Sequence, residues 1–363
     1  MPRIKPEIET FARIKVVGVG GSGGSAITRM MEARVRGVDF IAVNSDAQAL
    51  HNNKATHKIH IGKNLTRGLG AGMDPEIGRQ AAEENRDELH EAVKGADMIF
   101  ITCGLGGGTG SGAAPIVAEV AKDSGALTVA VVTKPFGFEG SQRLRIAEEA
   151  WAKLRDKVDA LITIPNDRIL NVIQKDTSLV QAFSTCDDVL KHAVQGISDL
   201  IIMPGLINVD FADVRAVMQD AGSALMGIGI ASGETRAVDA AKAAVSSPLL
   251  DLSIDGAKGV LFNVSGGQDM TMWEINEAAK AITESIDRDA KLIFGAVHDE
   301  RLKKGELKIT VIATGFNGLG NNGDAKRPPA FGATLAKSGP NGQAAKSEDE
   351  EWDSVPAFLR RKK

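Results

Sequence analysis

The sequence has few of the residues on which several classes of protein depend. Its only two cysteines, Cys103 and Cys186, lie in unrelated contexts. This excludes a disulfide framework and a cysteine-ligated metal site, and it favours a reducing cytoplasm. Lysine and arginine number 43 against 47 aspartate and glutamate, which gives a formal net charge of −4. No basic field is therefore expected to recruit nucleic acid.

The sequence also has no obvious membrane-targeting segment. Residues 1–13 are charged and contain Pro2 and Pro6, so they lack the apolar centre of a signal peptide. No later run reaches the roughly 18 apolar residues of a membrane span. A G-x-x-x-x-G-K-[ST] loop is absent as well. We expect a cytoplasmic protein without direct membrane insertion, in which phosphate binding does not depend on the lysine of such a loop.

What the sequence does contain is a regular alternation of apolar runs and helical patterns. The runs RIKVVGVG, DFIAVNSD, DMIFITCGL, ALTVAVVTKP and DALITIPND are nearly continuous, as expected of parallel strands covered on both faces. They predict a doubly wound α/β nucleotide-binding domain over residues 13–177, after an N-terminal extension at 1–12. One long central helix is expected at 178–203. Strand-rich sequence at 204–316 predicts a smaller α+β domain.

Composition changes after residue 316. Residues 317–347 include six glycines and three prolines and are expected to form a flexible linker. The last segment, 348–363, reads EDEEWDSVPAFLRRKK and combines apolar anchors with cations. Such a mixture is typical of a peptide that folds onto a partner's groove, although a disordered basic end is the plainer alternative. The candidate partner-binding residues are Val355, Pro356, Phe358, Leu359, Arg360 and Arg361.

Two glycine-rich loops each stand between a strand and a helix. The first, GVGGSGGSA, contains G-x-G-x-x-G at Gly18, Gly20 and Gly23; the second is GGGTGSG, from Gly106 to Gly112. Two helix amino-termini facing one site can hold a chain of phosphates through free N–H groups and partial positive charge. Close packing of helix on strand is the structural alternative. A nicotinamide dinucleotide is a remote alternative for the first loop, with Asp46 as an imperfect acidic match.

The second loop resembles the signature of the tubulin superfamily. The stretches VNSDAQAL, LTRGLGAG, PFGFEG, IPNDRIL, GLINVDFADVR and VIATGF are similar to the bacterial cell-division FtsZ family over residues 13–316, and the tail is similar too. This resemblance implies a self-assembling cytoskeletal GTPase that forms head-to-tail filaments at the division site, beneath the inner face of the cell membrane. The resemblance implies that the protein binds further copies of itself. It also implies that membrane-tethering and regulatory division proteins bind the tail. A non-hydrolysing or plasmid-partitioning tubulin-like scaffold is the alternative.

The resemblance also implies a set of GTP-binding residues. Phe183 is expected against the guanine ring and Asp187 on its edge, since guanine presents two neighbouring N–H donors that one carboxylate can accept. From the residues alone, Phe183 reads as a core aromatic and Asp187 as part of a solvated helix face. The full expected set is Gly20, Gly21, Ser22, Gly23, Gly24, Ser25, Gly104, Gly107, Gly108, Thr109, Gly110, Thr133, Glu139, Arg143, Asn166, Phe183 and Asp187.

Catalysis is expected to use a segment outside the glycine loops. Neither loop contains an acidic residue that could orient water, whereas GLINVDFADVR supplies Asn208, Asp210 and Asp213. In the family this segment enters the nucleotide pocket of the next subunit, so we expect Asp210 and Asp213 to act on the attacking water and Asn208 to position the loop or contact nucleotide. Simple capping of the following helix by Asp210 is the alternative. Mg²⁺ is expected, bound mainly through phosphates and water.

Three positions differ from common family forms. Ser22 and Ser25 replace a glycine and an asparagine in the first loop, and Met73 replaces a small residue near the expected γ-phosphate. A serine hydroxyl can still donate to phosphate or ribose. We therefore expect altered affinity or turnover, with binding retained.

Overall fold

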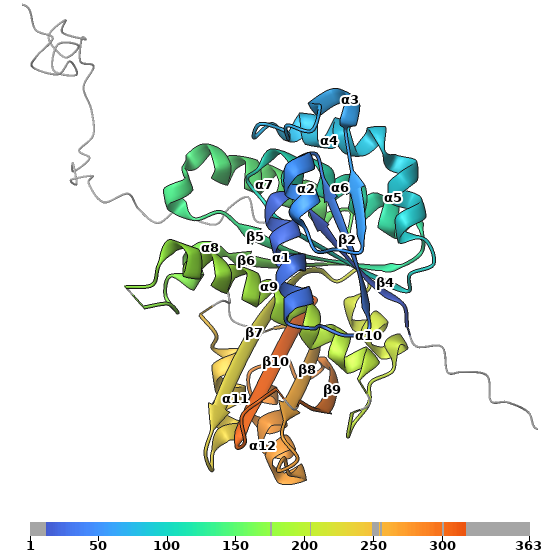
Figure 1. The fold of residues 1–363 in the computed structure, drawn as a ribbon. Coiled ribbons are helices and arrows are strands. Elements are labelled where there is room, and N and C mark those ends of the chain that lie inside the picture. Colours follow the sequence, from blue (N-terminus) through green and yellow to red (C-terminus); the bar gives the residue numbers. More distant parts are fainter. Residues whose placement is uncertain are drawn as a thin grey trace, which may run out of the picture. The chain divides into compact units, whose positions relative to one another are not determined.

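The computed structural model describes residues 12–174, 176–203, 205–248, 254, 256–299 and 301–316. These residues all belong to one unit (Figure 1). The expected linker at 317–347 and the tail at 348–363, with Val355, Pro356, Phe358, Leu359, Arg360 and Arg361, lie outside the described residues, as do residues 1–11 of the expected extension. The boundaries between the expected domains stay a prediction.

The first half of the described chain is a parallel sheet, as the apolar runs predict. Its strands are β1 (Ile14–Val19), β2 (Val38–Asn44), β3 (His57–His60), β4 (Met98–Gly104), β5 (Leu127–Lys134) and β6 (Ala160–Pro165). They are arranged in the order β3-β2-β1-β4-β5-β6 with parallel pairing throughout. The strand order reverses between β1 and β4, and in doubly wound sheets ligands bind at the carboxyl ends of the strands at such a point.

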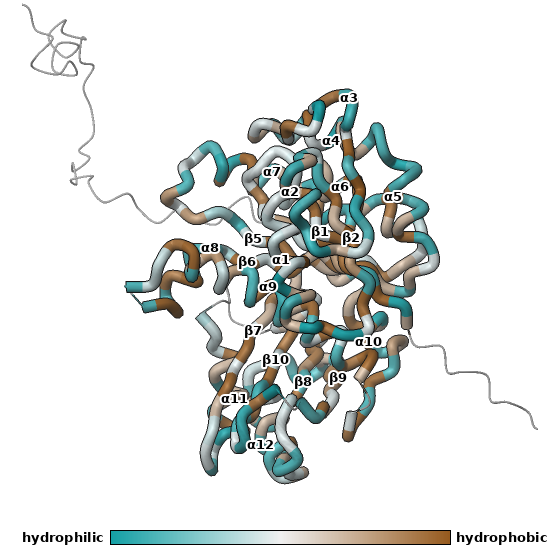
Figure 2. The backbone as a smooth tube through the Cα atoms, viewed as in Figure 1, coloured by the Kyte–Doolittle hydropathy of each residue, from teal (hydrophilic) through white to brown (hydrophobic). Residues whose placement is uncertain are grey.

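Helices cover both faces of this sheet. Alternate residues of β1 enter different cores: Val16 packs in a cluster with Ile27 and Val194, and Val17 in one with Val117. Figure 2 shows hydrophobic residues along the strands and more polar ones on the outer helices. The helices of the first half are α1 (Gly20–Glu32), α2 (Ala47–Asn52), α3 (Lys63–Thr66), α4 (Pro75–Glu84), α5 (Arg86–Val93), α6 (Gly108–Asp123), the 3-10 turn η1 (Gly137–Glu139), α7 (Ser141–Arg155) and α8 (Asn166–Ile169).

The predicted central helix is present as α9 (Leu179–Ile202). Its N-cap is Ser178, which forms a capping box with Gln181: the Gln181 N–H donates to Ser178 Oγ at 3.3 Å, and the Ser178 N–H donates to Gln181 Oε1 at 3.1 Å. One face of α9, including Leu190 and Ile197, packs into the same core as α1. In the part of the chain that the structure describes, no helix is long and apolar enough to cross a membrane.

The second half continues the same sheet. Its strands are β7 (Gly222–Ser232), β8 (Gly259–Gly266), β9 (Lys291–His298) and β10 (Glu306–Thr314), and its helices are α10 (Phe211–Met218), α11 (Arg236–Val245) and α12 (Met272–Thr283). β7 pairs with β6 in parallel over three residues, so the ten strands of the described residues form one sheet in the order β3-β2-β1-β4-β5-β6-β7-β10-β8-β9. β9 and β10 follow one another in sequence but do not pair, because β10 lies between β7 and β8 and β9 pairs with β8 in parallel.

Candidate nucleotide-binding site

A cavity of about 580 Å³ opens where the strand order reverses. The first glycine loop follows β1 and the second follows β4, and both contribute to its lining. An adjoining cavity of about 460 Å³ lies between α1 and α2. The two cavities share Gly21, Asn44, Ala49 and Asp187. Together they are large enough for a nucleotide, since small-molecule sites usually measure about 300–1,000 Å³.

The glycines are needed because the two loops touch each other through their backbones. Gly20 has a φ of +74°, and a Cβ added to it would lie 3.0 Å from the backbone N of Gly110. A Cβ on Gly110 would in turn lie 2.6 Å from the carbonyl oxygen of Gly104. Ser22 strengthens this junction, because the Gly104 N–H donates to Ser22 Oγ at 2.8 Å. The two glycine loops therefore pack closely against each other and still line an open cavity. The hydroxyl proton of Ser22 remains available to donate to a ligand.

Two helix amino-termini face the larger cavity and its neighbour. α1 begins at Gly20 and α6 at Gly108, with Val19 and Gly107 as their N-caps. Among the described residues, neither helix has a side-chain cap or an acidic residue in its first turn. The first-turn N–H groups of a helix have no intrahelical partners, and they carry a partial positive charge. This end of the cavity is suited to a chain of phosphates.

The other end of the larger cavity carries groups suited to a base and a ribose. Phe183 is 41% exposed and meets the buried Phe136 edge-on, with ring centroids 5.5 Å apart. The Arg143 guanidinium pairs with Glu139 at 2.8 Å. Asn166 is buried, and its Oδ1 has no hydrogen-bond partner among the described residues. A buried acceptor without a partner is costly unless a ligand supplies a donor.

Asp187 lies where both cavities meet. Its side chain is 17% exposed, and one of its carboxylate oxygens lies 3.5 Å from Arg29 Nε on α1. Burial raises the pKa of Asp187 to about 6, while the Arg29 guanidinium opposes this rise and the neighbouring Asp188 adds to it. A carboxylate with this pKa is mostly ionised at neutral pH and can accept two N–H donors.

The structure brings together nearly all the nucleotide-site residues expected from the sequence. Gly23 is the exception, because it lines neither cavity: a Cβ there would overlap Thr102 O, so it serves the packing of α1 on β4. The larger cavity is lined by Gly21, Ser22, Gly104, Gly107, Gly108, Thr109, Gly110, Thr133, Glu139, Arg143, Asn166, Phe183 and Asp187. The adjoining one is lined by Gly20, Gly21, Gly24, Ser25 and Asp187. The Ser25 hydroxyl donates to Gly21 O at 3.2 Å, within α1.

The expected catalytic segment lies elsewhere. The described lining of these cavities does not include Asn208, Asp210 or Asp213, and all three are exposed. Asn208 positions its own loop, since the Gly205 N–H donates to its Oδ1 at 2.7 Å. Asp210 occupies the N-cap position of α10, but among the described residues its side chain makes no cap hydrogen bond. Capping by the Asp210 side chain therefore does not account for this residue.

A loop of which the sequence analysis named only Met73, near the expected γ-phosphate, also lines the larger cavity. Residues Gly70, Ala71, Gly72 and Met73 contribute to the lining, and Gly70, Gly72 and Met73 have positive φ values. Asn44 and Asp46 contribute from the end of β2. Asp46 is already engaged as the N-cap of α2, accepting from the Ala49 N–H at 2.9 Å. The glycine spacing of LTRGLGAG was the one available signal for this loop.

The described residues that line the cavity form no all-protein metal site. Within the described residues, no group of three or more histidine, cysteine, aspartate or glutamate side chains could hold a metal ion. Cys186 contributes to the lining, but burial raises the pKa of its thiol to about 12, so it stays a neutral packed group. This donor set fits Mg²⁺ only if phosphates and water supply most of its oxygen ligands.

Comparisons with known proteins agree with this geometry. Residues 13–174 match the tubulin/FtsZ family GTPase domain, and residues 222–317 match the FtsZ family C-terminal domain. An empty FtsZ dimer from M. jannaschii is 47% identical and superposes with a TM-score of 0.82, covering 85% of this chain and 89% of that one. A tryptophan-to-tyrosine mutant of M. jannaschii FtsZ is also 47% identical, with a TM-score of 0.82 and coverages of 85% and 92%. CetZ2 from Haloferax volcanii, in a GTPγS-bound protofilament, is 22% identical and superposes with a TM-score of 0.71. The match covers 83% of this chain and 92% of that one, and it shows a shared fold.

Proposed function

The chain belongs to the FtsZ branch of the tubulin/FtsZ family, and we propose that it hydrolyses GTP at a site completed by contact between successive subunits of a filament. As a member of this family it is a GTP-dependent cytoskeletal filament protein of cell division. GTPase activity in general follows from the family. Its activation by assembly is the further step, argued below.

GTP occupies the larger cavity in this proposal. The triphosphate lies against the first turns of α1 and α6, where Gly21, Ser22, Gly108, Thr109 and Gly110 offer backbone N–H groups. The ribose lies near Glu139 and Arg143, and Asn166 accepts a hydrogen bond at its free Oδ1. The guanine ring packs on Phe183, and its two adjacent N–H donors meet the carboxylate of Asp187. Mg²⁺, when bound through phosphate oxygens and water, supplies charge neutralisation at the leaving group.

The shared site is supported by how the acidic residues of the cavity are already used. The larger cavity is lined by three carboxylates among the described residues: Asp46, Glu139 and Asp187. Asp46 caps α2, Glu139 pairs with Arg143, and Asp187 lies at the base end beside Arg29. None of these three is free to orient a water molecule at the phosphate end. This is the observation that carries the proposal, because hydrolysis needs a group that positions the attacking water.

Asp210 and Asp213 of the neighbouring subunit supply that group in our proposal. Both are exposed at the start of α10, and Asn208 holds the loop that precedes them. Within the described chain, the Asp210 side chain is not engaged in capping α10, so its carboxylate can serve another molecule. A carboxylate accepts a hydrogen bond from the attacking water and so places its oxygen in line with the terminal phosphorus. Once GTP is cleaved, the phosphate that lay between the two subunits is lost, and the contact weakens.

Exposed apolar side chains support contact at both ends. Leu69 is 86% exposed in the loop before α4, Phe138 is 66% exposed in η1, and Val180 is 78% exposed at the start of α9. Leu206 is 69% exposed in the loop that carries Asn208. A heterologous contact between these two surfaces repeats from subunit to subunit and produces an open filament. We further propose that the protein works at the division site beneath the cell membrane, with adaptors docking on the tail.

The test is complementation between two inactive subunits. Asp213→Ala retains an intact GTP cavity, and Gly108→Val retains intact Asp210 and Asp213. In an equal mixture about one interface in four joins an intact cavity to intact aspartates, as head-to-tail pairing requires. We expect phosphate release in the mixture to exceed the sum of the two separate proteins. Equality with that sum, under conditions where both variants sediment with the unchanged protein, would refute the shared site.

A further inference from the structure

The first turn of α6 is held by backbone contacts from several directions. A Cβ added to Gly108 would lie 2.8 Å from Ala71 Cβ and 2.9 Å from the backbone N and O of Asp74. Gly20 of α1 also approaches this turn, since a Cβ added to it would lie 3.0 Å from the backbone N of Gly110. This turn carries the N–H groups that face the cavity, so its position decides how they meet a phosphate.

A further contact comes from α4, at a residue that does not belong to the cavity. Gly78 is buried and is absent from the described lining of both cavities. A Cβ on Gly78 would overlap the carbonyl oxygen of Gly108, and it would lie 3.0 Å from the Gly108 carbonyl carbon and 3.1 Å from Thr109 Cα. Real Cβ atoms essentially never come closer than 3.0 Å to another heavy atom. A side chain at position 78 must therefore displace the backbone of the α6 turn.

The atom that is displaced belongs to the same peptide group as a candidate phosphate donor. The carbonyl of Gly108 and the N–H of Thr109 form one planar unit, so a push on the oxygen turns the N–H as well. Thr109 lies in the first turn of α6, where an N–H has no intrahelical partner. Its side chain is fixed independently, because its hydroxyl and that of Ser45 lie 2.7 Å apart in a hydrogen bond.

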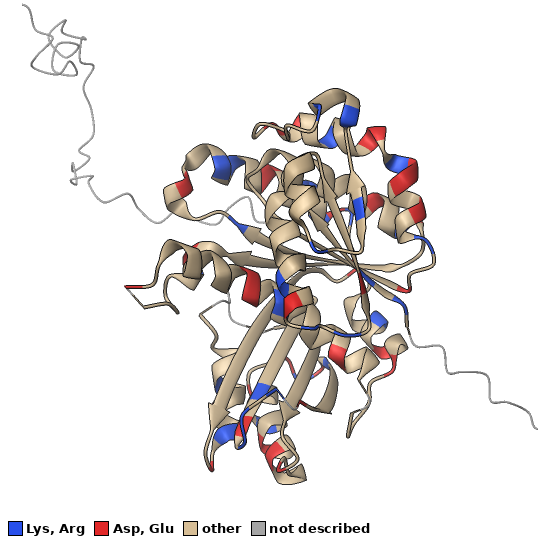
Figure 3. Cartoon of the chain, viewed as in Figure 1, with Lys and Arg blue, Asp and Glu red and all other residues tan. Residues whose placement is uncertain are grey.

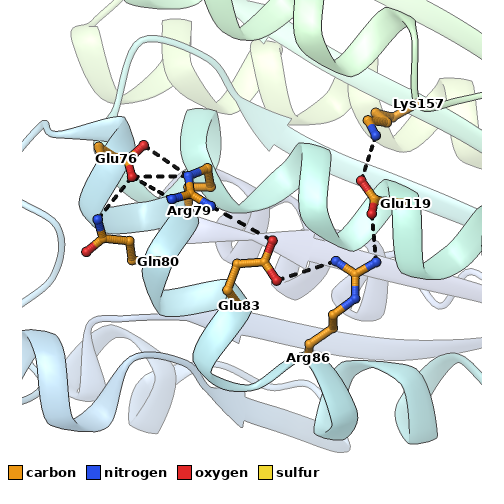
Figure 4. Close-up of polar contacts among 7 residues, drawn as sticks. All are labelled: Glu76, Arg79, Gln80, Glu83, Arg86, Glu119 and Lys157. Carbon is orange, nitrogen blue, oxygen red and sulfur yellow. Dashed lines mark hydrogen bonds and ion pairs between the residues drawn. The ribbon is translucent and has the colours of Figure 1, made fainter.

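α4 cannot easily move away to relieve such a push. Further along the contact between the two helices, a Cβ on Gly112 of α6 would overlap Pro75 O, so their backbones touch there as well. Figure 4 shows a chain of ion pairs that ties α4 and the start of α5 to α6. Its links join Glu76 to Arg79 at 2.6 Å, Arg79 to Glu83 at 3.9 Å, Glu83 to Arg86 at 3.4 Å, Arg86 to Glu119 at 2.7 Å, and Glu119 to Lys157 at 2.6 Å.

We propose that Gly78 is a positioning residue for the triphosphate: its missing side chain lets α4 support the Gly108–Thr109 peptide in the orientation that binds phosphate. This inference rests on the proposed function, since it assigns a role to α4 in the same site. It predicts that a single methyl group at position 78, which cannot reach the ligand, weakens nucleotide binding. The base end of the site stays intact, because Asp187 and Phe183 lie on a different helix.

The experiment measures the dissociation constants of GTP and ATP for the full-length chain, at protein concentrations below assembly. Gly78→Ala is expected to weaken GTP binding by about tenfold to a hundredfold, the loss that follows when one hydrogen bond to a charged phosphate is broken. The ratio between GTP and ATP is expected to stay unchanged. The matched control is Gly227→Ala, whose Cβ would overlap Ala244 O in the seam between β7 and α11, outside the described lining of both cavities. It is expected to lower thermal stability similarly and leave GTP affinity within about twofold.

A second variant guards against failure of Gly78→Ala to fold. Asp74→Ala removes the cap of α4 without adding an atom to the seam, and it is expected to weaken GTP binding by a few-fold in the same direction. GTP binding by Gly78→Ala at the unchanged affinity overturns the proposal, as does equal loss in Gly227→Ala. If Gly78→Ala does not fold, unchanged affinity in Asp74→Ala overturns it. Failure of the unchanged protein to bind GTP overturns the proposed function as well, which separates the two.

Discussion

Replacing Asp187 by asparagine changes the chemistry of the base end of the site while keeping its shape. The carboxylate has two acceptor oxygens, whereas the amide has one acceptor and one donor group. Guanine would keep one hydrogen bond, to the remaining oxygen, and its amino group would face the amide NH₂. Xanthine carries an oxygen in place of that amino group, so it matches the amide. The variant is therefore expected to lose GTP and gain xanthosine triphosphate.

The size of the loss follows from the hydrogen bonds exchanged. Hydrogen bonds to a charged group contribute about 1.5–3 kcal/mol each, and an unpaired buried donor costs about 1–3 kcal/mol. Losing one such bond and weakening the other amounts to about 3–4 kcal/mol, or two to three orders of magnitude in affinity. The nucleotide-free variant is expected to be no less stable. Burial raises the pKa of Asp187 in the folded protein to about 6, so ionisation of this carboxylate already costs folding free energy at neutral pH, a cost that the neutral amide avoids.

Titration calorimetry with GTP and with xanthosine triphosphate at pH 7.5 measures this change of nucleotide specificity directly. Asp188→Asn is the matched control, because Asp188 pairs with Lys191 at 2.7 Å and lines neither described cavity. In the unchanged protein, GTP affinity should also fall about tenfold per pH unit below pH 6, as Asp187 becomes protonated, and Asp187→Asn should lack this component. Retention of GTP by Asp187→Asn within threefold, or an equal loss in Asp188→Asn, would refute the assignment.

Three further predictions concern other parts of the site. Asp210→Asn and Asp213→Asn should each lower GTP turnover by about a hundredfold or more, comparable to loss of a general base, while leaving the GTP dissociation constant unchanged in a filter-binding assay. Ser22→Ala removes the acceptor for the Gly104 N–H and should lower the free energy of unfolding by about 1 kcal/mol in urea denaturation. Leu206→Glu should raise the protein concentration needed for sedimentation with GTP, since it puts a charge on an exposed apolar contact, without changing GTP affinity measured on dilute protein.

Much of the fold and site could be predicted because the relevant signals are local. A parallel strand covered on both faces is a nearly unbroken apolar run, and each of the five runs forms a strand: β1, β2, β4, β5 and β6. The glycine loops after β1 and β4 marked the place where two helix amino-termini meet. The expected start of the central helix, residue 178, coincides with the N-cap of α9. Figure 3 shows both signs of charge scattered over the visible helices, in keeping with a net charge near zero.

The parts that were not predicted depend on contacts between distant segments. Nothing in the amino-acid sequences of β9 and β10 shows that β10 lies between β7 and β8, because strand order is decided by packing across the sheet. The left-handed conformations of Gly70, Gly72 and Met73 are fixed by the turn they build beside the cavity. In the sequence, Gly78 is an ordinary glycine within a helix, and only the folded structure shows that a Cβ there would overlap the carbonyl oxygen of Gly108. The sequence likewise does not show that, among the described residues, the Asp210 side chain makes no capping hydrogen bond to α10.

The continuity of the sheet bears on what happens when a filament is bent or stretched. In our proposal one neighbour contacts the cavity, at the carboxyl ends of the first strands, and the other contacts the segment with Asp210, which follows α9. Tension along the filament therefore passes through the interior of each subunit. The route includes the short ladder of β6 and β7, in which only Ala160, Leu161 and Ile162 face Gly222, Ser223 and Ala224. A three-pair ladder has far fewer hydrogen bonds to share a load than the eight-pair ladder of β7 and β10. Mechanical yielding of a subunit should therefore begin at this seam, with the two flanking blocks of strands still folded.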